Sequence, residues 1–223
     1  MPAPIVPPPT TTILLTAAVF TPRTSGDPPT AVRTCGAMDD AGWRVAASSY
    51  VLDSPYLRIR RDRIVLPDGT VIEDYYVRES RGYVIVFALT EDRRVVLVRQ
   101  YKHGAAKVLL ELIAGAIDEG EQPLQTAIRE LAEETGYGAR SMEHLRSFVT
   151  DPTNADTIAH LFFAKDAYPN GEQQLDVTED IAVELATLDE LREKLRSGEI
   201  DSMPHVGAMY FVLDHLGSLT GPP

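Results

Sequence analysis

Short apolar runs separated by turn-forming residues make up most of the chain after residue 43. Two of them, at 56–65 and 71–77, flank the turn Leu66-Pro67-Asp68-Gly69 and predict a β-hairpin. The later predicted strands are the runs at 83–89, 95–101, 108–113, 142–149, 158–164 and 181–186. The first two of these are almost continuously apolar, which is typical of central strands. The pattern therefore predicts a small antiparallel β unit followed by a larger sheet.

The segment 123–135 instead has the spacing of an amphipathic helix. The apolar residues that would form its packed face are Leu124, Ala127, Ile128 and Leu131. Pro123 suits the first helical position, where no N–H partner is lost, and Gly136 suits the left-handed residue just past the end. We expect this face to pack against the rest of the protein while another face stays polar.

Two more helices are predicted near the C-terminus. Thr187 and Glu190 have the spacing of a capping box, and Gly198 ends the helix that this box begins. A last helix is predicted at about 204–216. Strands that surround one helix and are followed by a helical pair indicate a mixed sheet layered with helices, in the α/β (α+β) class.

The chain before residue 43 differs in composition. Residues 1–42 hold eight of the 16 prolines and few large apolar residues, so we expect a disordered tail. A Pro-rich peptide that binds a partner is the alternative, and Met38 is a candidate for the true start. The expected organisation is a tail at 1–42, a β unit at 43–78, a larger domain at 79–218 and a tail at 219–223.

The overall charge limits the classes of partner. A net charge of -12 and a pI near 4.8 argue against nucleic-acid binding, which needs concentrated Lys and Arg. Cys35 is the single cysteine, which excludes an intrachain disulfide, and the interrupted apolar run at 13–20 fits neither a membrane span nor a secretory signal. We expect a cytoplasmic protein that binds neither membranes nor nucleic acid. An acidic site can still hold a phosphorylated ligand if divalent cations lie between the two.

A charged constellation surrounds the first predicted helix. Its members are Gly115, Glu121, Arg129, Glu130, Leu131, Glu133, Glu134, Gly136 and Tyr137. At about 100° per residue, Glu130, Glu133 and Glu134 share one helix face. Like charges so close repel one another, and oxygen ligands of this kind suit Mg²⁺ or Mn²⁺. A solvated Glu-rich face is the alternative, but nine specified positions at fixed gaps favour a metal site.

This segment resembles the Nudix box, Gly-x5-Glu-x7-Arg-Glu-U-x-Glu-Glu-x-Gly-U, in which U is a bulky apolar residue. Every specified position matches, and Tyr137 is a less usual occupant of the last one. The resemblance implies a Nudix hydrolase domain at 79–218 with the α/β/α sandwich and mixed sheet of that family. The small antiparallel β unit precedes it, whereas the Pro-rich tail has no counterpart.

The resemblance also implies roles for the box residues. The implied metal ligands are Glu130, Glu133, Glu134 and the main-chain carbonyl of Ala114. Glu121 would hold Arg129, which in turn would brace Glu133 four residues later. The implied chemistry is attack of water on one phosphorus, with Mg²⁺ or Mn²⁺ activating the water and neutralising charge as the pyrophosphate bond opens.

Features outside the box resemble the ADP-ribose pyrophosphatase branch of the family. Arg99-Gln100-Tyr101-Lys102 is similar to the branch's Arg-Gln-Tyr-Arg, so Arg99 and Lys102 are candidate phosphate ligands, although Lys102 cannot bind in a bidentate way. Glu111-Leu112-Ile113-Ala114-Gly115 is similar to Glu-Leu-Pro-Ala-Gly, which makes Glu111 a candidate for holding an adenine or ribose edge. Pro152 lies at the spacing of the branch's marker proline, but Thr153 stands where a glycine is usual.

The branch often takes a general base from a loop late in the domain, here at 169–180. Of the acidic residues in this loop we favour Glu179, and a solvated acidic loop is the alternative. The unit at 43–78 resembles the one through which the branch forms homodimers and completes the substrate pocket. Tyr76, with Tyr75, is a candidate for stacking on adenine, unless the two are core residues. The five histidines lack metal-ligand spacing and are interpreted as structural or surface residues.

The resemblance therefore implies a small-molecule nucleotide substrate, with hydrolysis of ADP-ribose to AMP and ribose 5-phosphate as the leading function. Another nucleotide sugar or a dinucleotide, such as GDP-mannose or NADH, is the alternative within the enzyme class. A non-catalytic domain that senses a nucleotide is the alternative outside it. Such domains usually lack box carboxylates, and none is missing here.

Overall fold

The structure is a computed structural model that describes residues 42–55 and 57–220, the last three by their main chain alone. Apart from Gly42, the predicted tail at 1–42 lies outside the described residues, as do Met38, Cys35 and the apolar run at 13–20. None of the helices in the described part is long and apolar enough to cross a membrane.

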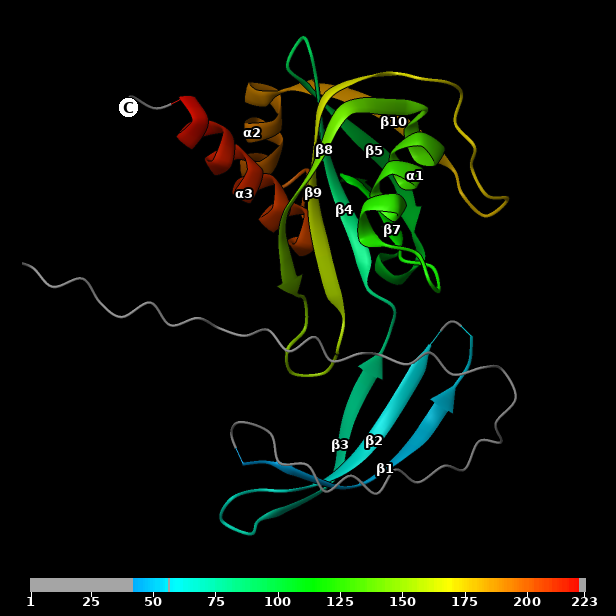
Figure 1. Ribbon diagram of the computed structural model, residues 1–223, viewed down its shortest axis with the longest axis vertical. Coiled ribbons are helices and arrows are strands. Elements are labelled where there is room, and N and C mark those ends of the chain that lie inside the picture. Colours follow the sequence, from blue (N-terminus) through cyan, green and yellow to red (C-terminus); the bar gives the residue numbers. More distant parts are fainter. Residues whose placement is uncertain (1–41, 56, 221–223) are drawn as a thin grey trace, which may run out of the picture.

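The N-terminal unit is a three-stranded antiparallel sheet in the order β1-β2-β3 (Figure 1). Its strands are β1 (Arg44–Asp53), β2 (Arg58–Val65) and β3 (Val71–Glu79). The predicted hairpin is confirmed as β2 and β3, and its turn is closed by the N–H of Gly69, which donates to the carbonyl of Leu66 at 3.0 Å. Gly69 has φ +86°, a conformation that favours glycine.

The larger unit is a seven-stranded mixed sheet in the order β10-β5-β4-β9-β8, with β6 paired to β5 and β7 to β4. Its strands are β4 (Tyr83–Thr90), β5 (Arg94–Lys102), β6 (Lys107–Glu111), β7 (Ile113–Ala116), β8 (Tyr137–Val149), β9 (Ile158–Pro169) and β10 (Ile181–Thr187). Its helices are α1 (Pro123–Thr135), α2 (Leu188–Ser197), α3 (Met203–Thr220) and the short 3-10 helix η1 (His103–Ala105). Strands β4 and β9 run parallel, and the other named pairs are antiparallel.

Two cores lie on opposite faces of the central strands, because successive side chains of a strand point to opposite sides. Phe87 and Leu97 face the layer formed by α2 and α3. Val86 and Val98 face α1 on the other side, as the arrangement in Figure 1 shows. The predicted α/β/α sandwich is confirmed, and the continuous apolar runs are explained by burial on both faces.

The structure differs from the predicted elements in three places. The run at 108–113 is two strands and not one, because the chain leaves β5 at Leu112 and pairs next with β4. Strands β8 and β9 are longer than predicted, since they pair with each other over their whole length. Helix α3 continues to Thr220, beyond the predicted end near 216 and into the predicted tail at 219–223.

The predicted packed face of α1 is wrong at two positions. Ala127 and Leu131 are buried, but Leu124 is 45% exposed and Ile128 is 53% exposed. The helix instead turns its Glu130 side toward the sheet, where that residue is buried. The periodicity predicted where the helix lies in the sequence. It did not predict which of the apolar residues face the sheet.

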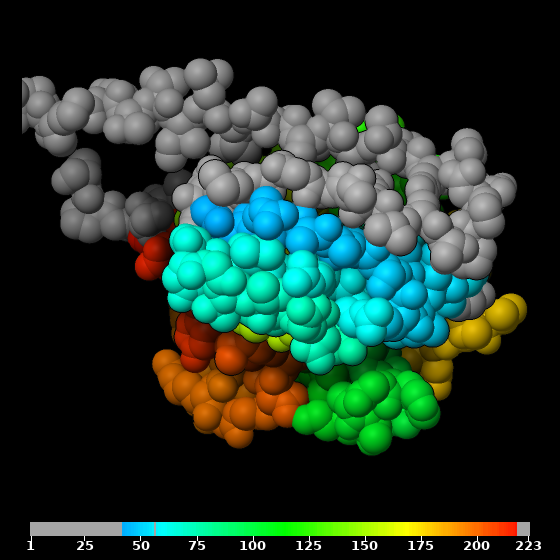
Figure 2. All heavy atoms as spheres, turned by 90° about the horizontal axis from the view of Figure 1, so that it is seen from below, coloured from blue at the N-terminus to red at the C-terminus, as the bar shows by residue number. Residues whose placement is uncertain are grey.

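The β8–β9 connection joins the two sheets. The N–H of Arg78, in β3, donates to the carbonyl of Asn154 at 2.7 Å, and Arg78 forms a parallel bridge with Ala155. The hydroxyl of Tyr75 donates to the carbonyl of Thr153 at 2.5 Å. Figure 2 shows the N-terminal unit, blue to cyan, as a slab across this end of the molecule.

Candidate active site

Arg129 organises the carboxylates of α1. Its Nε and Nη2 each donate to one oxygen of Glu121 at 3.0 Å. Its Nη1 donates to Glu130 Oε1 and Glu133 Oε2, both at 2.8 Å. The hydrogen bonds from Arg129 lower the pKa of Glu121 to about 2. One guanidinium therefore holds three acidic side chains, including the Glu121 contact that the resemblance implies.

Glu134 and Glu130 lie in the interior beside β7. The side chain of Glu134 accepts a hydrogen bond from the N–H of Ala114 at 3.3 Å. Burial raises the pKa of Glu134 to about 8, and the negative charges of Glu130 and Glu179 add to the increase. Burial also raises the pKa of Glu130. Arg129 already contacts Glu130, so ionising Glu134 near pH 7 needs further positive charge beside it.

Gly115 makes room for one of these carboxylates. A Cβ atom built on Gly115 would lie 1.9 Å from both the Cδ and the Oε1 of Glu130. No real Cβ approaches an atom so closely, so any other residue would displace the carboxylate. The first glycine of the box is thus explained by the carboxylate that passes beneath it.

The residues of this cluster fit a hard divalent cation that keeps part of its water shell. The donors available to a cation would be carboxylate oxygens and the neighbouring main-chain carbonyl of Ala114, an all-oxygen set typical of magnesium or manganese sites. Among residues 42–55 and 57–220, no three His, Cys, Asp or Glu side chains converge closely enough to form a complete cation site. Waters and phosphate oxygens of a ligand would have to supply the remaining positions, as is usual for magnesium.

Glu179 lies on the loop between β9 and β10. Its Oε2 accepts a hydrogen bond from the N–H of Asp176 at 3.0 Å, so the carboxylate is folded onto its own loop. Its charge contributes to the raised pKa of both Glu130 and Glu134. The structure thus brings Glu179 into the electrostatic range of the box cluster, although its role as a base stays a prediction.

The guanidinium of Arg99 is paired with two carboxylates. Its Nη2 donates to Glu184 at 3.2 Å and to Glu199 at 2.9 Å, and its Nε also contacts Glu184. Strand alternation puts Arg99 on the face of β5 that carries Leu97, which packs toward α2 and α3. A phosphate contact by Arg99 stays a prediction, and it would require exchange of these ion pairs.

Glu111 lies in the interior with Lys102 and His205. The Glu111 residue is 3% exposed, Lys102 Nζ lies 3.7 Å from its Oε2, and His205 Nε2 lies 3.4 Å from its Oε1. Among the described residues, Oε2 has no hydrogen-bond partner. A substrate contact of Glu111 stays a prediction. Because Glu111 is buried and the Lys102 side chain is 42% exposed, a ligand would meet Lys102 first.

His205 is a structural histidine with a defined tautomer. Its Nδ1 accepts a hydrogen bond from the N–H of Leu112 at 3.1 Å, at the point where β6 gives way to β7. Burial lowers the pKa of His205 to about 4, so the ring is neutral near pH 7. Since Nδ1 is the acceptor, the proton is on Nε2 and faces Glu111. The spacing of histidines in the sequence gave no sign of this contact.

Tyr76 and Pro152 lie at the junction of the two sheets. Tyr76 is 44% exposed, and its main-chain carbonyl accepts from Asn154 Nδ2 at 3.3 Å. The loop that contains Pro152 binds β3 through Thr153 and Asn154. Tyr76 thus lies on the strand that the loop of Pro152 binds, and the roles of both residues in substrate binding stay predictions.

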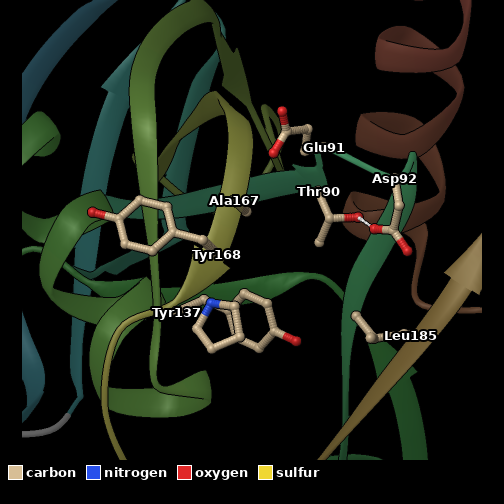
Figure 3. Close-up of a pocket in the computed structure, with 8 residues that line it drawn as sticks. Thr90, Glu91, Asp92, Tyr137, Ala167, Tyr168 and Leu185 are labelled. Carbon is tan, nitrogen blue, oxygen red and sulfur yellow. Dashed lines mark hydrogen bonds between the residues drawn. The ribbon is translucent and has the colours of Figure 1, made fainter.

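A hollow of about 620 Å³ lies beyond the C-terminal end of α1 and includes none of the predicted ligands. Its lining residues are Thr90, Glu91, Asp92, Tyr137, Ala167, Tyr168, Pro169 and Leu185. Figure 3 shows Tyr137 and Tyr168 across from Thr90, whose hydroxyl donates to Asp92 at 2.6 Å. The hollow contains no cluster of carboxylates like that on α1, so the chemistry is better placed at the box.

Comparison with known proteins shows similarity over most of the described chain. A NUDIX domain model matches residues 79–206, and a model of the Nucleoside diphosphate sugar hydrolase N-terminal domain matches residues 43–77. The Methanol dehydrogenase activator of Bacillus methanolicus is 38% identical over 160 residues, which cover 70% of this chain and 85% of that protein. The ADP-ribose pyrophosphatase of Bacillus subtilis is 29% identical over 158 residues, with the same coverage of 70% and 85%. A crystal structure of an ADP compounds hydrolase aligns with a TM-score of 0.71 at 20% identity, covering 82% of this chain and 98% of that one, which shows a shared fold.

Proposed function

This chain belongs to the NUDIX family, and we propose that it hydrolyses the pyrophosphate bond of ADP-ribose to give AMP and ribose 5-phosphate. The observation that carries the proposal is the pair of buried carboxylates, Glu130 and Glu134, beside Gly115 on the segment that the family model matches. The match of residues 43–77 to a nucleoside diphosphate sugar hydrolase domain supports a sugar-linked substrate. The relative in Bacillus subtilis that is named an ADP-ribose pyrophosphatase supports ADP-ribose in particular.

The cofactor in this proposal is Mg²⁺ or Mn²⁺. The residues that would hold it are Glu130, Glu133, Glu134 and the main-chain carbonyl of Ala114. When bound, the cation lowers the pKa of a water molecule and neutralises charge on the diphosphate. Arg129 keeps Glu130 and Glu133 in place through its two Nη1 hydrogen bonds of 2.8 Å.

In the same proposal, Glu179 accepts a proton from the attacking water. To do so, its Oε2 would exchange the hydrogen bond from Asp176 for one from water, which a turn within a loop can allow. Lys102, whose side chain is 42% exposed, would meet a phosphate oxygen as a point charge.

The proposed assembly is a homodimer in the cytoplasm. The single cysteine in the chain suits a reducing compartment. A second copy would cover the apolar side chains that the N-terminal unit exposes, among them Val51 and Leu52. Tyr76, half exposed at the junction, is then available to stack on a base.

A substrate panel tests the proposal. Purified protein is incubated with ADP-ribose, GDP-mannose, NADH and deoxynucleoside triphosphates in the presence of Mg²⁺, and the products are separated by chromatography. We expect AMP and ribose 5-phosphate from ADP-ribose at the highest kcat/KM of the panel. Absence of AMP from ADP-ribose contradicts the substrate assignment, and hydrolysis of GDP-mannose or NADH in its place identifies the second candidate. That second candidate is favoured by Thr153, which stands where the ADP-ribose pyrophosphatase branch usually has a glycine.

A further inference from the structure

The C-terminal end of α1 is completed by a segment far away in the sequence. A helix leaves its last carbonyl groups without partners inside the helix, and in α1 these include the carbonyls of Glu133 and Glu134. The main-chain N–H of Gln174 donates to the carbonyl of Glu133 at 2.9 Å. The side-chain amide of Gln173 donates to the carbonyl of Glu134 at 2.6 Å. The loop after β9 therefore caps two of the three helix residues whose side chains belong to the acidic cluster.

Gly136 allows this loop to come close. Gly136 has φ +71°, and a Cβ atom built on it would lie 2.5 Å from the carbonyl oxygen of Gly171. The N–H of Asn170 donates to the carbonyl of Gly136 at 2.8 Å. Gly136, the second glycine of the box, therefore both ends the helix and allows the loop to pack against it. A side chain at this position would push the loop away.

Gln173 also fixes the other end of the loop. Its Nε2 donates a second hydrogen bond, at 3.1 Å, to the carbonyl of Ile181, the first residue of β10. One amide group therefore joins the end of α1 to the start of β10. Leu175 packs against the buried cluster that contains Leu131. The residues that follow, 176–180, are exposed and span the distance between two fixed points.

Glu179 lies in this exposed part. A turn closes it, because its N–H donates to the carbonyl of Asp176 at 2.9 Å and its side chain accepts from the N–H of the same residue at 3.0 Å. All residues of the turn are exposed, so its position follows mainly from the points at which the loop is anchored. The anchors are Gln173 and Gln174 on one side and Ile181 on the other.

We propose that Gln173 is a positioning residue that holds the Glu179 turn in register with Glu130 and Glu134. The proposal rests on the function proposed above, in which Glu179 takes the proton of the attacking water. Gln173 touches neither substrate nor cation in this scheme. It acts through the loop, by fixing how far the Glu179 turn lies from the helix that carries the cluster.

The test compares Gln173→Ala with Gln174→Ala in the full chain. Gln174 is the matched control, because its contact uses the main-chain N–H and survives the substitution. The first readout is hydrogen–deuterium exchange of the amides at 175–181, without substrate. The second is kcat and KM for ADP-ribose. These are measured for both variants, for Glu179→Gln, and for the double variant that combines Gln173→Ala with Glu179→Gln.

We expect faster exchange at 175–181 in Gln173→Ala only, with the melting temperature close to that of the wild type. Displacing a reacting group by about an ångström costs on the order of ten-fold or more in rate, so kcat should fall by about that factor while KM changes little. In the Glu179→Gln background the same substitution should have little further effect, because the group that it positions is gone.

Unchanged exchange in Gln173→Ala overturns the proposal, and so does a loss of kcat that is equally large in the Glu179→Gln background. An equal loss in Gln174→Ala overturns it as well, since that variant keeps the anchor. If the wild type hydrolyses no diphosphate-linked nucleotide, the proposed function fails separately, and the exchange rates still decide whether Gln173 fixes the loop.

Discussion

Individual residues of the box are explained by their neighbours in space. Gly115 lies against the carboxylate of Glu130, and Glu121 is paired with Arg129. The sequence could predict that three glutamates share a helix face, because helix geometry alone decides that. It could not predict that the Glu134 residue is only 4% exposed, since burial depends on where β7 passes over the helix.

Replacing Gly115 by alanine should move the Glu130 carboxylate. A methyl group at the Cβ position would overlap its Cδ and Oε1, and forced overpacking of this kind costs about 1–3 kcal/mol. We expect the variant to fold with a lower melting temperature and to lose at least about ten-fold in kcat/KM for ADP-ribose. Gly104→Ala is the control, because a Cβ there meets nothing within 4 Å. Equal activity of the two variants would show that the Glu130 position does not matter.

The raised pKa of Glu134 predicts a pH dependence of stability in protein freed of metal with EDTA. The folded-state pKa is about 8, against an ordinary value of 4.5, so between these pH values the folded protein holds a proton that the unfolded chain has lost. The free energy of unfolding should therefore fall as pH rises through this window, by a few kcal/mol at most, on the order of 1.4 kcal/mol for each unit of pKa shift.

Glu134→Gln should remove this contribution. Urea unfolding at pH 5 and pH 8 should show that the variant gains stability over the wild type mainly at pH 8. Added Mg²⁺ should narrow the gap by stabilising the wild type. A difference in stability that is the same at both pH values would argue against a Glu134 that is protonated in the folded, metal-free protein.

At the scale of elements, local signals in the sequence located the helices and strands, while their neighbours had to come from the structure. The proline at the start of α1 and the glycine after it gave the bounds of that helix, which are Pro123–Thr135. The break at Leu112 carries no local signal, because it depends on β6 and β7 pairing with different strands. The exposure of Leu124 and Ile128 likewise depends on which part of the sheet lies under α1.

The end of α1 offers a prediction at this scale. Gly136→Ala would strain a left-handed residue, which costs roughly 1–2 kcal/mol, and would also push against the carbonyl of Gly171, 2.5 Å from the new Cβ. We expect a lower free energy of unfolding and faster limited proteolysis within 170–180. Gly198→Ala is the control, since it has the same kind of φ, +78°, but an open surrounding. Equal proteolysis of both variants would contradict the role of Gly136 in docking the loop.

At the scale of the whole molecule, the N-terminal unit cannot stabilise itself. Of its described strand residues, Asp62 and Ile64 alone are buried, and a three-stranded sheet without a covered apolar face is marginally stable. Its hydrogen bonds with the larger unit, among the described residues, run mainly through the β8–β9 connection. The sequence predicted this unit from its hairpin and from the family resemblance, but not that the β8–β9 loop holds it.

Because the N-terminal unit buries so few of its own residues, we expect a homodimer in solution. Light scattering coupled to size-exclusion chromatography should give twice the chain mass of 24.5 kDa at micromolar concentration. Val51→Asp together with Leu52→Asp, at positions that are 50% and 44% exposed, should shift the protein toward the monomer. The double substitution Asp189→Asn with Glu193→Gln, on the exposed side of α2, is the control. A wild type that elutes as a monomer would contradict the prediction.

The most direct test of the account is the release of AMP from ADP-ribose as a function of Mg²⁺ concentration in the wild type and in Glu134→Gln. We expect release that saturates with Mg²⁺ and is abolished by EDTA in the wild type, and that falls by about 100-fold or more in the variant. Circular dichroism would confirm that the variant is folded. Release that persists in EDTA, or that is undiminished in Glu134→Gln, would contradict the claim that the buried carboxylates of α1 hold the cation that drives hydrolysis.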